Sequence, residues 1–253
     1  MPLLQTVDLT KSFGGIRAVE RLSLSLGDSQ ITGLIGPNGA GKSTVFNLIT
    51  GFLPPDAGRV LFNSKDITRH SPHKLVELGL ARCWQGVRLF NNLAAIENVA
   101  MAVKRPSKGG RFSGLIIGWT PISGFSREII EKARHYIEMV GLAGKSRDVV
   151  ADLSFAERKL VSIAMLLATE ARLLLLDEPA SGLDARSLTR TMFPLLFKLA
   201  EAGRTLFLVE HNIELVKECC KKVFFMHHGA LLAEGTPEEI TRDSELKQIY
   251  FGT

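Results

Sequence analysis

The sequence has few cysteines and no long hydrophobic run, and each absence excludes a class of protein. Its three cysteines, Cys83, Cys219 and Cys220, are odd in number and have no histidine partner at metal-ligand spacing. We therefore expect reduced thiols in a reducing compartment. Uninterrupted apolar runs, such as residues 173–176, are far shorter than the roughly 20 residues that span a bilayer. The sequence accordingly predicts a soluble chain, whose membrane role must come through a partner.

A dense cluster of lysine and arginine is also missing. The chain has 31 basic and 26 acidic residues in a length of 253, which gives a net charge of +5. This modest excess suits an ATP-binding surface, acidic lipid head groups, RNA or plain solubility, and we favour the last. Residues 1–5 lack the basic region and apolar core of a secretory signal. The length allows one large α/β domain or two joined lobes.

What the sequence does have is GPNGAGKST at residues 36–44, between an apolar run typical of a strand and a helical pattern. This is G-x-x-x-x-G-K-[ST] in its required setting. Glycines let the backbone curl so that its N–H groups surround an anion, and the start of the helix adds the positive end of its dipole. We expect Lys42 to reach the β- and γ-phosphates of a nucleotide, Ser43 to ligate Mg²⁺, and Thr44 to add a hydroxyl and an N–H.

Two further apolar strands are expected to end in polar residues. One is followed by Asp177 and Glu178, and the other by Glu210 and His211. Because the carboxyl ends of parallel strands meet at one edge of a sheet, both sets should point into one crevice with the phosphate loop.

The chemistry of these side chains suits nucleotide hydrolysis. Asp177 can hold Mg²⁺ directly or through water, opposite Ser43, and Glu178 can act as general base or orient a water. The amide of Gln85 can touch the metal shell and the attacking water, and the imidazole of His211 can sense the γ-phosphate. A glutamine in a loop and a single histidine are also common structural residues, so both interpretations of these two stay open.

Around this core, the pattern predicts antiparallel strands at 3–9 and 22–26 and a mostly helical lobe. Ser71 and Pro72 predict the start of a helix that runs to about residue 78, and the apolar pattern predicts another helix at 160–168. Phe13, in the turn between the two strands, can stack on an adenine ring or fill the core. The lobe includes an apolar segment, residues 115–119, which either packs internally or faces a membrane-embedded partner.

Together these residues resemble the ATP-binding subunit of ABC transporters over nearly the whole chain. The matching stretches, in the order of the family, are GPNGAGKST (Walker A), Gln85 (Q-loop), LSFAE at 153–157 (signature), LLLLDEP (Walker B), SGLD (D-loop) and VEHN (switch histidine). Within the family, the chain looks most like the subunits of branched-chain amino acid importers, through KSFGGIRAV at 11–19, ARCWQGVRLF at 81–90, the long segment before Ser126 and GTPEEI at 235–240.

The resemblance implies an α/β P-loop NTPase of the ABC type, with a mostly parallel core sheet, an antiparallel β subdomain and a helical subdomain that carries the signature. It implies one domain over 1–253, with the nucleotide core at 1–85 and 166–253 and the helical lobe at 86–165. ATP and Mg²⁺ are the implied cofactors. The implied nucleotide-binding residues are Phe13, Val19, Gly36, Asn38, Gly39, Gly41, Lys42, Ser43, Thr44, Ser154, Glu157 and Asp184. The implied metal ligands are Ser43, Gln85 and Asp177, and the implied catalytic residues are Glu178, His211 and Gln85.

Members of this family work as a head-to-tail pair, in which the Walker A motif of one subunit faces the signature of the other. The implied partners are transmembrane permease subunits, a second ABC ATPase subunit (identical or different) and, indirectly, a periplasmic or extracellular binding protein, but no nucleic acid. The implied location is the cytoplasmic face of the cell membrane. Urea, amide and lipid transporters have closely similar subunits, so the cargo stays open. The alternatives are a soluble ABC ATPase without a transport role and a regulatory subunit that hydrolyses ATP poorly.

The chain departs from the family at the signature. Ala156 stands where a glycine is expected, and its Cβ can crowd the γ-phosphate bound by the partner subunit. Any defect therefore falls on the partner's ATP and not on the one bound at Lys42. A self-paired chain would carry the alanine at both sites.

Overall fold

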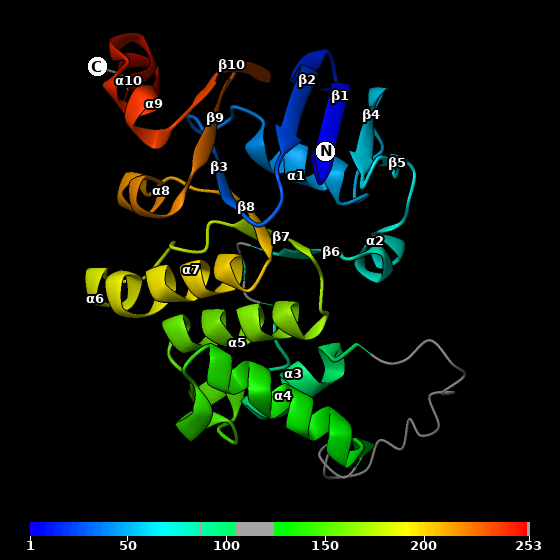
Figure 1. Cartoon of the computed structure of the whole chain (residues 1–253), viewed down its shortest axis with the longest axis vertical. Helices are drawn as coiled ribbons and strands as arrows, with labels where there is room; N and C mark the ends of the chain where they lie inside the picture. Colours follow the sequence, from blue (N-terminus) through cyan, green and yellow to red (C-terminus); the bar gives the residue numbers. More distant parts are fainter. Residues whose placement is uncertain (85, 87, 105–123, 252–253) are drawn as a thin grey trace. The chain divides into compact units, whose positions relative to one another are not determined.

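The computed structural model describes residues 1–84, 86, 88–104 and 124–251 of the chain (Figure 1). It divides into two compact units, one made of Met1–Gln85 with Arg172–Thr253 and the other of Gly86–Ala171. Two features predicted from the sequence, Gln85 and the apolar segment 115–119, lie outside the described residues.

The first unit contains a six-stranded sheet with the order β10-β9-β3-β8-β7-β6. Strands β9, β3, β8, β7 and β6 pair in parallel, and β10 is antiparallel to β9. Three of the strands, β3, β7 and β8, are buried along their whole length, as expected of central parallel strands. The bounds are β3 (Ile31–Ile35), β6 (Leu80–Cys83), β7 (Leu173–Asp177), β8 (Thr205–Val209), β9 (Lys222–His227) and β10 (Ala230–Gly235).

A second, antiparallel sheet in the same unit has the order β2-β1-β4-β5. Its strands are β1 (Leu4–Phe13), β2 (Ile16–Leu26), β4 (Ala57–Phe62) and β5 (Lys65–Asp66). The first two run further than the predicted 3–9 and 22–26, because register shifts interrupt the alternation of polar and apolar residues. Asp8 and Arg21, both at positive φ, lie in these irregular stretches. Phe13 therefore ends a strand.

Helix α1 (Lys42–Ile49) connects the two sheets through a shared core. Its Phe46 ring lies 5.1 Å from that of Phe207 on β8, which in turn lies 6.5 Å from Phe224 on β9 (centroid distances). Full burial of a phenylalanine side chain contributes about 1.5–3 kcal/mol. Leucines of β1 and β2 complete this core, so the helix that follows the phosphate loop is held from both sides (Figure 1).

Short helices complete the first unit. Helix α2 begins at Pro72 after Ser71, as the sequence predicted, although the Ser71 side chain makes no capping hydrogen bond. No helix in the described part of the chain is long and apolar enough to cross a membrane. The bounds are α2 (Pro72–Leu78), α6 (Ala185–Ser187), a π-helical turn (Leu188–Met192), α7 (Phe193–Glu201), α8 (Ile213–Cys219), α9 (Pro237–Arg242) and α10 (Ser244–Phe251).

The second unit is helical in the part that the structure describes, where three helices pack on one another. They are α3 (Ala95–Ala102), α4 (Arg127–Met139) and α5 (Phe155–Ala168), with 3₁₀ turns at Ala143–Lys145 and Val150–Asp152. The apolar pattern predicts that α5 starts at residue 160. It starts five residues earlier because Ser154 and Glu157 form a capping box at its N-terminus.

Candidate functional site

The phosphate loop joins the end of β3 to the start of α1, and two of its glycines are required by the space around them. A Cβ on Gly36 would lie 2.0 Å from the Met226 carbonyl oxygen, and one on Gly41 would lie 2.2 Å from the Ala18 carbonyl oxygen. Their φ angles are +149° and +100°, a region that side chains disfavour. Gly39 also has a positive φ, but a Cβ added there would have no atom within 4 Å. Asn38 and Gly39 are exposed at the tip of the loop.

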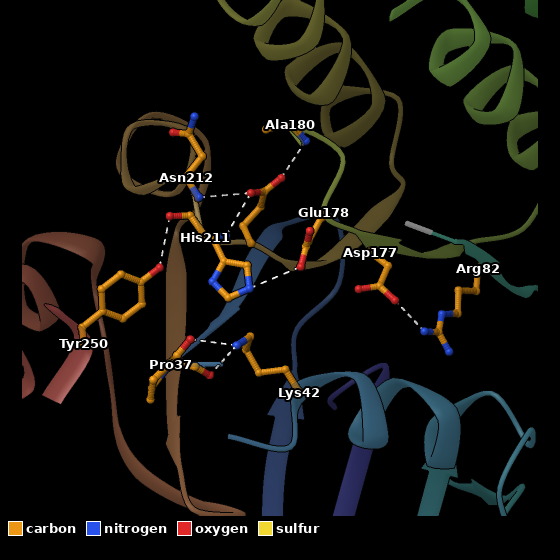
Figure 2. A network of polar contacts seen from close by, with 11 residues as sticks. Pro37, Lys42, Arg82, Asp177, Glu178, Ala180, His211, Asn212 and Tyr250 are labelled. Atoms are coloured by element: carbon orange, nitrogen blue, oxygen red, sulfur yellow. Dashed lines mark hydrogen bonds and ion pairs between the residues drawn. The ribbon is translucent and has the colours of Figure 1, made fainter. Parts of the chain in front are cut away.

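Lys42 curls back over this loop. Its ammonium donates hydrogen bonds to the carbonyl oxygens of Gly36 at 2.7 Å and Pro37 at 2.9 Å (Figure 2). Burial lowers the pKa of Lys42, whereas the charges of Glu178 and Asp177 raise it. The ammonium thus lies within the field of both carboxylates. The neighbouring Ser43 is exposed, so its hydroxyl is accessible to a ligand.

Asp177 is the last residue of β7 and is buried. Its Oδ2 accepts a hydrogen bond from Nη2 of Arg82 at 2.5 Å, and Nη1 of the same guanidinium donates to the side-chain oxygen of Asn47 at 2.6 Å. Arg82 also lies over the ring of Trp84, with 4.0 Å from Cζ to the ring. The aspartate is therefore oriented by Arg82 of β6 (Figure 2), and the bond from Arg82 to Asn47 joins this pair to α1.

Glu178 follows at once in an uncommon backbone conformation. Its φ is +50°, in the left-handed region that costs a non-glycine residue about 1–2 kcal/mol. Its N–H donates to the Val209 carbonyl at 2.8 Å and its carbonyl accepts from Ser181 at 3.1 Å, and these bonds help to hold the turn. Such conformations cluster at active sites, where surrounding contacts maintain them.

His211 approaches this glutamate from the end of β8. Its Nε2 lies 3.3 Å from Oε1 of Glu178 (Figure 2). Burial, followed by the charge of Lys42, lowers the pKa of His211, and Glu178 and Asp177 oppose the shift. At neutral pH the imidazole is therefore uncharged, and the contact is a hydrogen bond that Nε2–H donates to the carboxylate. The structure thus brings Lys42, Asp177, Glu178 and His211 together, as the strand ends predicted. The prediction was wrong for Glu210, which is buried and accepts hydrogen bonds from backbone N–H groups instead of pointing into the crevice.

Other predicted residues lie elsewhere in the first unit. The Phe13 side chain is 46% exposed, so it does not fill the core; its role in stacking on adenine stays a prediction. Val19 is fully buried in β2. Thr44 is half-buried in the first turn of α1. Asp184 caps α6 by accepting a hydrogen bond from the Ser187 N–H at 2.6 Å, and the backbone and side chain of Ser187 lower the pKa of this carboxyl.

The signature residues lie in the second unit. Ser154 Oγ accepts from the Glu157 N–H at 3.3 Å, and Glu157 Oε2 accepts from the Ser154 N–H at 2.8 Å. Lys145 makes an ion pair of 2.6 Å with Glu157 and is the first cause of the lowered pKa of that carboxyl. Phe155 and Ser154 are exposed, and Ala156 is half-buried in the first turn of α5.

The sequence predicted no role for Arg82, and for Glu210 it predicted only a place at the end of a strand. Both are charged residues next to or within apolar strands, and both are buried. A buried charge needs a partner, so the charge inside the strand pattern was the available signal.

The comparisons with known proteins agree with this geometry. The family model described as "ABC transporter" matches residues 19–181. The chain belongs to the ABC transporter family. The high-affinity branched-chain amino acid transport ATP-binding protein BraF of Pseudomonas aeruginosa is 36% identical to it, over 99% of this chain and 98% of the relative. The corresponding LivG protein of Escherichia coli is 34% identical over 99% and 98%.

Solved structures give the same result. A nucleotide-free ATP-binding cassette from an ABC transporter superposes with a TM-score of 0.87 at 31% identity and covers 100% of both chains. An ATP-binding cassette of an ABC transporter in its ADP conformation gives 0.85 at 30% identity, again over 100% of both. The predicted fold class is confirmed, and the chain is a member of a family of ATP-binding, ATP-hydrolysing subunits.

Proposed function

We propose that this chain is the ATP-hydrolysing subunit of an importer for branched-chain or related amino acids, working at the cytoplasmic face of the cell membrane. The similarity to BraF and LivG, over nearly their whole lengths, supports this cargo. The observation that carries the proposed hydrolysis is the hydrogen bond between His211 and Glu178 in the electrostatic field of Lys42.

In the proposed mechanism, the phosphates of ATP lie in the loop formed by Gly36, Asn38, Gly39 and Gly41. Lys42 exchanges its bonds to the loop carbonyls for bonds to phosphate oxygens, and the N–H groups of the first turn of α1, including that of Thr44, add donors. Phe13 stacks on the adenine, and Val19 lies in the buried core that also includes Ala40 of the loop.

Glu178 orients the attacking water and accepts its proton, while His211 releases its hydrogen bond to Glu178 and donates Nε2–H to the γ-phosphate. A neutral imidazole suits this exchange, because it has one N–H to give and needs no charge to be neutralised. Gln85 is proposed to touch the same water.

The residues fit a magnesium ion. Ser43 offers an exposed hydroxyl, and Asp177 offers a carboxylate held by Arg82, which are the oxygen ligands that Mg²⁺ prefers. We propose Ser43, Asp177 and Gln85 as its ligands, directly or through water. When bound, the ion neutralises charge on the β- and γ-phosphates.

The proposed partners are transmembrane permease subunits, a second ABC ATPase subunit and, through the permease, a binding protein outside the membrane. Ser154 and Glu157 then serve the nucleotide of the second ATPase, and Asp184 lies at the contact between the two. The Ser154 hydroxyl is exposed at the N-terminus of α5, where a helix favours an anion.

Uptake measurements test this function. We would replace the chromosomal gene by Lys42→Ala and measure uptake of radiolabelled leucine, valine and urea in intact cells. The proposal expects loss of leucine and valine uptake with urea uptake unchanged, and co-purification of the tagged chain with multi-span membrane proteins. Loss of urea uptake alone would mean that the cargo is urea and not a branched-chain amino acid. Normal uptake of all three solutes would contradict the importer role.

A further inference from the structure

We propose that Glu210 is a positioning residue that couples the turn after Glu178 to the turn that carries His211. This inference rests on the proposed function, because it concerns how the carboxylate and the imidazole of that site keep their spacing. It assigns a task to a buried charge that the hydrolytic mechanism itself does not use.

The contacts of Glu210 span both turns. Its Oε1 accepts a hydrogen bond from the backbone N–H of Ala180 at 2.7 Å. Its Oε2 accepts two, from the N–H groups of His211 at 3.0 Å and Asn212 at 3.2 Å (Figure 2). One carboxylate therefore joins residues 30 or more positions apart in the chain.

Glu210 is only 2% exposed, so its charge is stabilised by these donors rather than by bulk water. Hydrogen bonds to a charged acceptor contribute more than neutral ones, and a low local dielectric strengthens them. The ends of β7 and β8 are already neighbours in the sheet, with Asp177 opposite Val209. Glu210 extends that pairing beyond the last strand residues, to the two turns where the sheet can no longer hold the backbone.

A second contact holds the His211 turn from the other side. The Tyr250 hydroxyl, on α10, donates to the His211 carbonyl at 3.1 Å (Figure 2). Glu210 and Tyr250 thus fix both backbone polar groups of His211. The imidazole is left free to exchange Glu178 for a phosphate while its backbone stays in place.

The test is a set of variants measured for ATP turnover, nucleotide binding and backbone exchange. Glu210→Gln keeps the size of the side chain but turns an –NH₂ donor toward backbone donors, so one of the two turns loses its acceptor. We expect kcat to fall at least about tenfold, with KM and the affinity for a fluorescent ATP analogue within about twofold, because a small misplacement of reacting groups costs this much. Hydrogen exchange should become faster in peptides covering 178–184 and 209–213 together.

Matched variants keep the outcome interpretable. Glu214→Gln removes the same charge from an exposed position in the next helix and should leave kcat and both peptides unchanged. If Glu210→Gln does not fold, Glu210→Asp keeps the charge but is too short to reach both turns, and the same loss of kcat is expected. If Glu178→Gln is inactive but the Glu210 variant that folds has a kcat near that of the wild type, the inference is overturned. Full turnover by Glu178→Gln instead overturns the catalytic role proposed for Glu178, on which this inference rests.

Discussion

His211 and Glu178 are bonded to each other, with 3.3 Å between Nε2 and Oε1, although they lie on the turns after two different strands. In this arrangement His211, the proposed phosphate sensor, holds one carboxylate oxygen of Glu178, the proposed base, in a hydrogen bond. A water can use the carboxylate fully only after the imidazole has turned to another acceptor. The γ-phosphate is the acceptor whose arrival would release Glu178, so substrate binding and activation of the base become one event.

Glu178→Gln tests the base directly. The amide keeps the size of the side chain but cannot accept a proton, so we expect turnover to fall by about 10²–10⁴-fold while ATP binding is retained. Steady-state ATPase assays and binding of a fluorescent analogue measure the two effects. Glu238→Gln, an exposed charge on α9, is the control and should be silent. Unchanged turnover in Glu178→Gln would remove this residue from the catalytic role.

The pH dependence of stability should report on His211. Its pKa in the folded chain is below the ordinary 6.5, mainly because of burial. At pH values between the pKa in the folded chain and 6.5, the unfolded chain binds more protons at this histidine than the folded chain does. The free energy of unfolding therefore rises with pH and reaches its full value above 6.5. This contribution to stability is lost as the pH falls toward the pKa in the folded chain. Urea unfolding between about pH 5 and 8 should show a smaller slope for His211→Gln than for the wild type. Equal slopes would mean that this histidine does not titrate as proposed.

The ion pair between Arg82 and Asp177 should matter for folding. Both side chains are buried, with 4% and 7% exposure. Arg82→Ala leaves a buried carboxylate without its guanidinium, and we expect the free energy of unfolding to fall by about 3–5 kcal/mol. Urea denaturation measures this.

An exposed pair in the same unit provides the comparison. Lys74 and Glu77 form an ion pair of 2.9 Å with about half of each side chain exposed. Lys74→Ala should cost at most about 1 kcal/mol. A similar small cost for Arg82→Ala would show that the buried pair is not a main support of Asp177.

Substitutions at two glycines of the phosphate loop can distinguish the cost of backbone strain from the cost of a steric clash. Gly39 and Gly41 both have positive φ, but a Cβ meets nothing within 4 Å at Gly39 and the Ala18 carbonyl oxygen at 2.2 Å at Gly41. Gly39→Ala should cost about 1–2 kcal/mol of unfolding free energy, from the left-handed conformation alone. Gly41→Ala should cost clearly more, because two backbone segments must separate. Both are measured without nucleotide, and equal costs would contradict the close approach.

The elements that the sequence predicted correctly are those whose pattern lies within a few neighbouring residues. The strand before the phosphate loop and the strand at 205–209 were recognisable because buried parallel strands are short, continuous apolar runs. The first two strands were predicted too short, because bulges shift the alternation of residues. The early start of α5 did have a local signal, since Ser154 and Glu157 have the spacing of a capping box.

The contacts that hold the site are not local. Arg82 reaches Asp177 across 95 positions, and Glu210 reaches Ala180 across 30. Each pair exists because neighbouring parallel strands end in a common register, which follows from the assembled sheet and not from either segment alone. A charge within or beside an apolar strand indicates that a partner is needed but not which residue supplies it.

The alanine in the signature gives a prediction in which stability and activity change in opposite directions. Ala156 is in the first turn of α5, and glycine is the poorer helix former, by up to about 1 kcal/mol. Ala156→Gly should therefore lower the free energy of unfolding slightly. If the signature faces a second ATPase subunit as proposed, the substitution should also raise the ATPase activity of the assembled complex, because the γ-phosphate bound by that subunit can approach the backbone more closely.

The control for helix propensity is Ala200→Gly in α7, which should be destabilising without any gain in turnover. A gain that appears only when the partner retains its own Walker A lysine would locate the effect at the partner's nucleotide. A gain in turnover that persists when the Walker A lysine of a different partner subunit is removed would place the effect at the nucleotide bound by Lys42. That outcome would indicate that this chain pairs with a second copy of itself. Unchanged turnover would mean that the Cβ of Ala156 is accommodated, and the departure from glycine would then carry no cost to the neighbouring site.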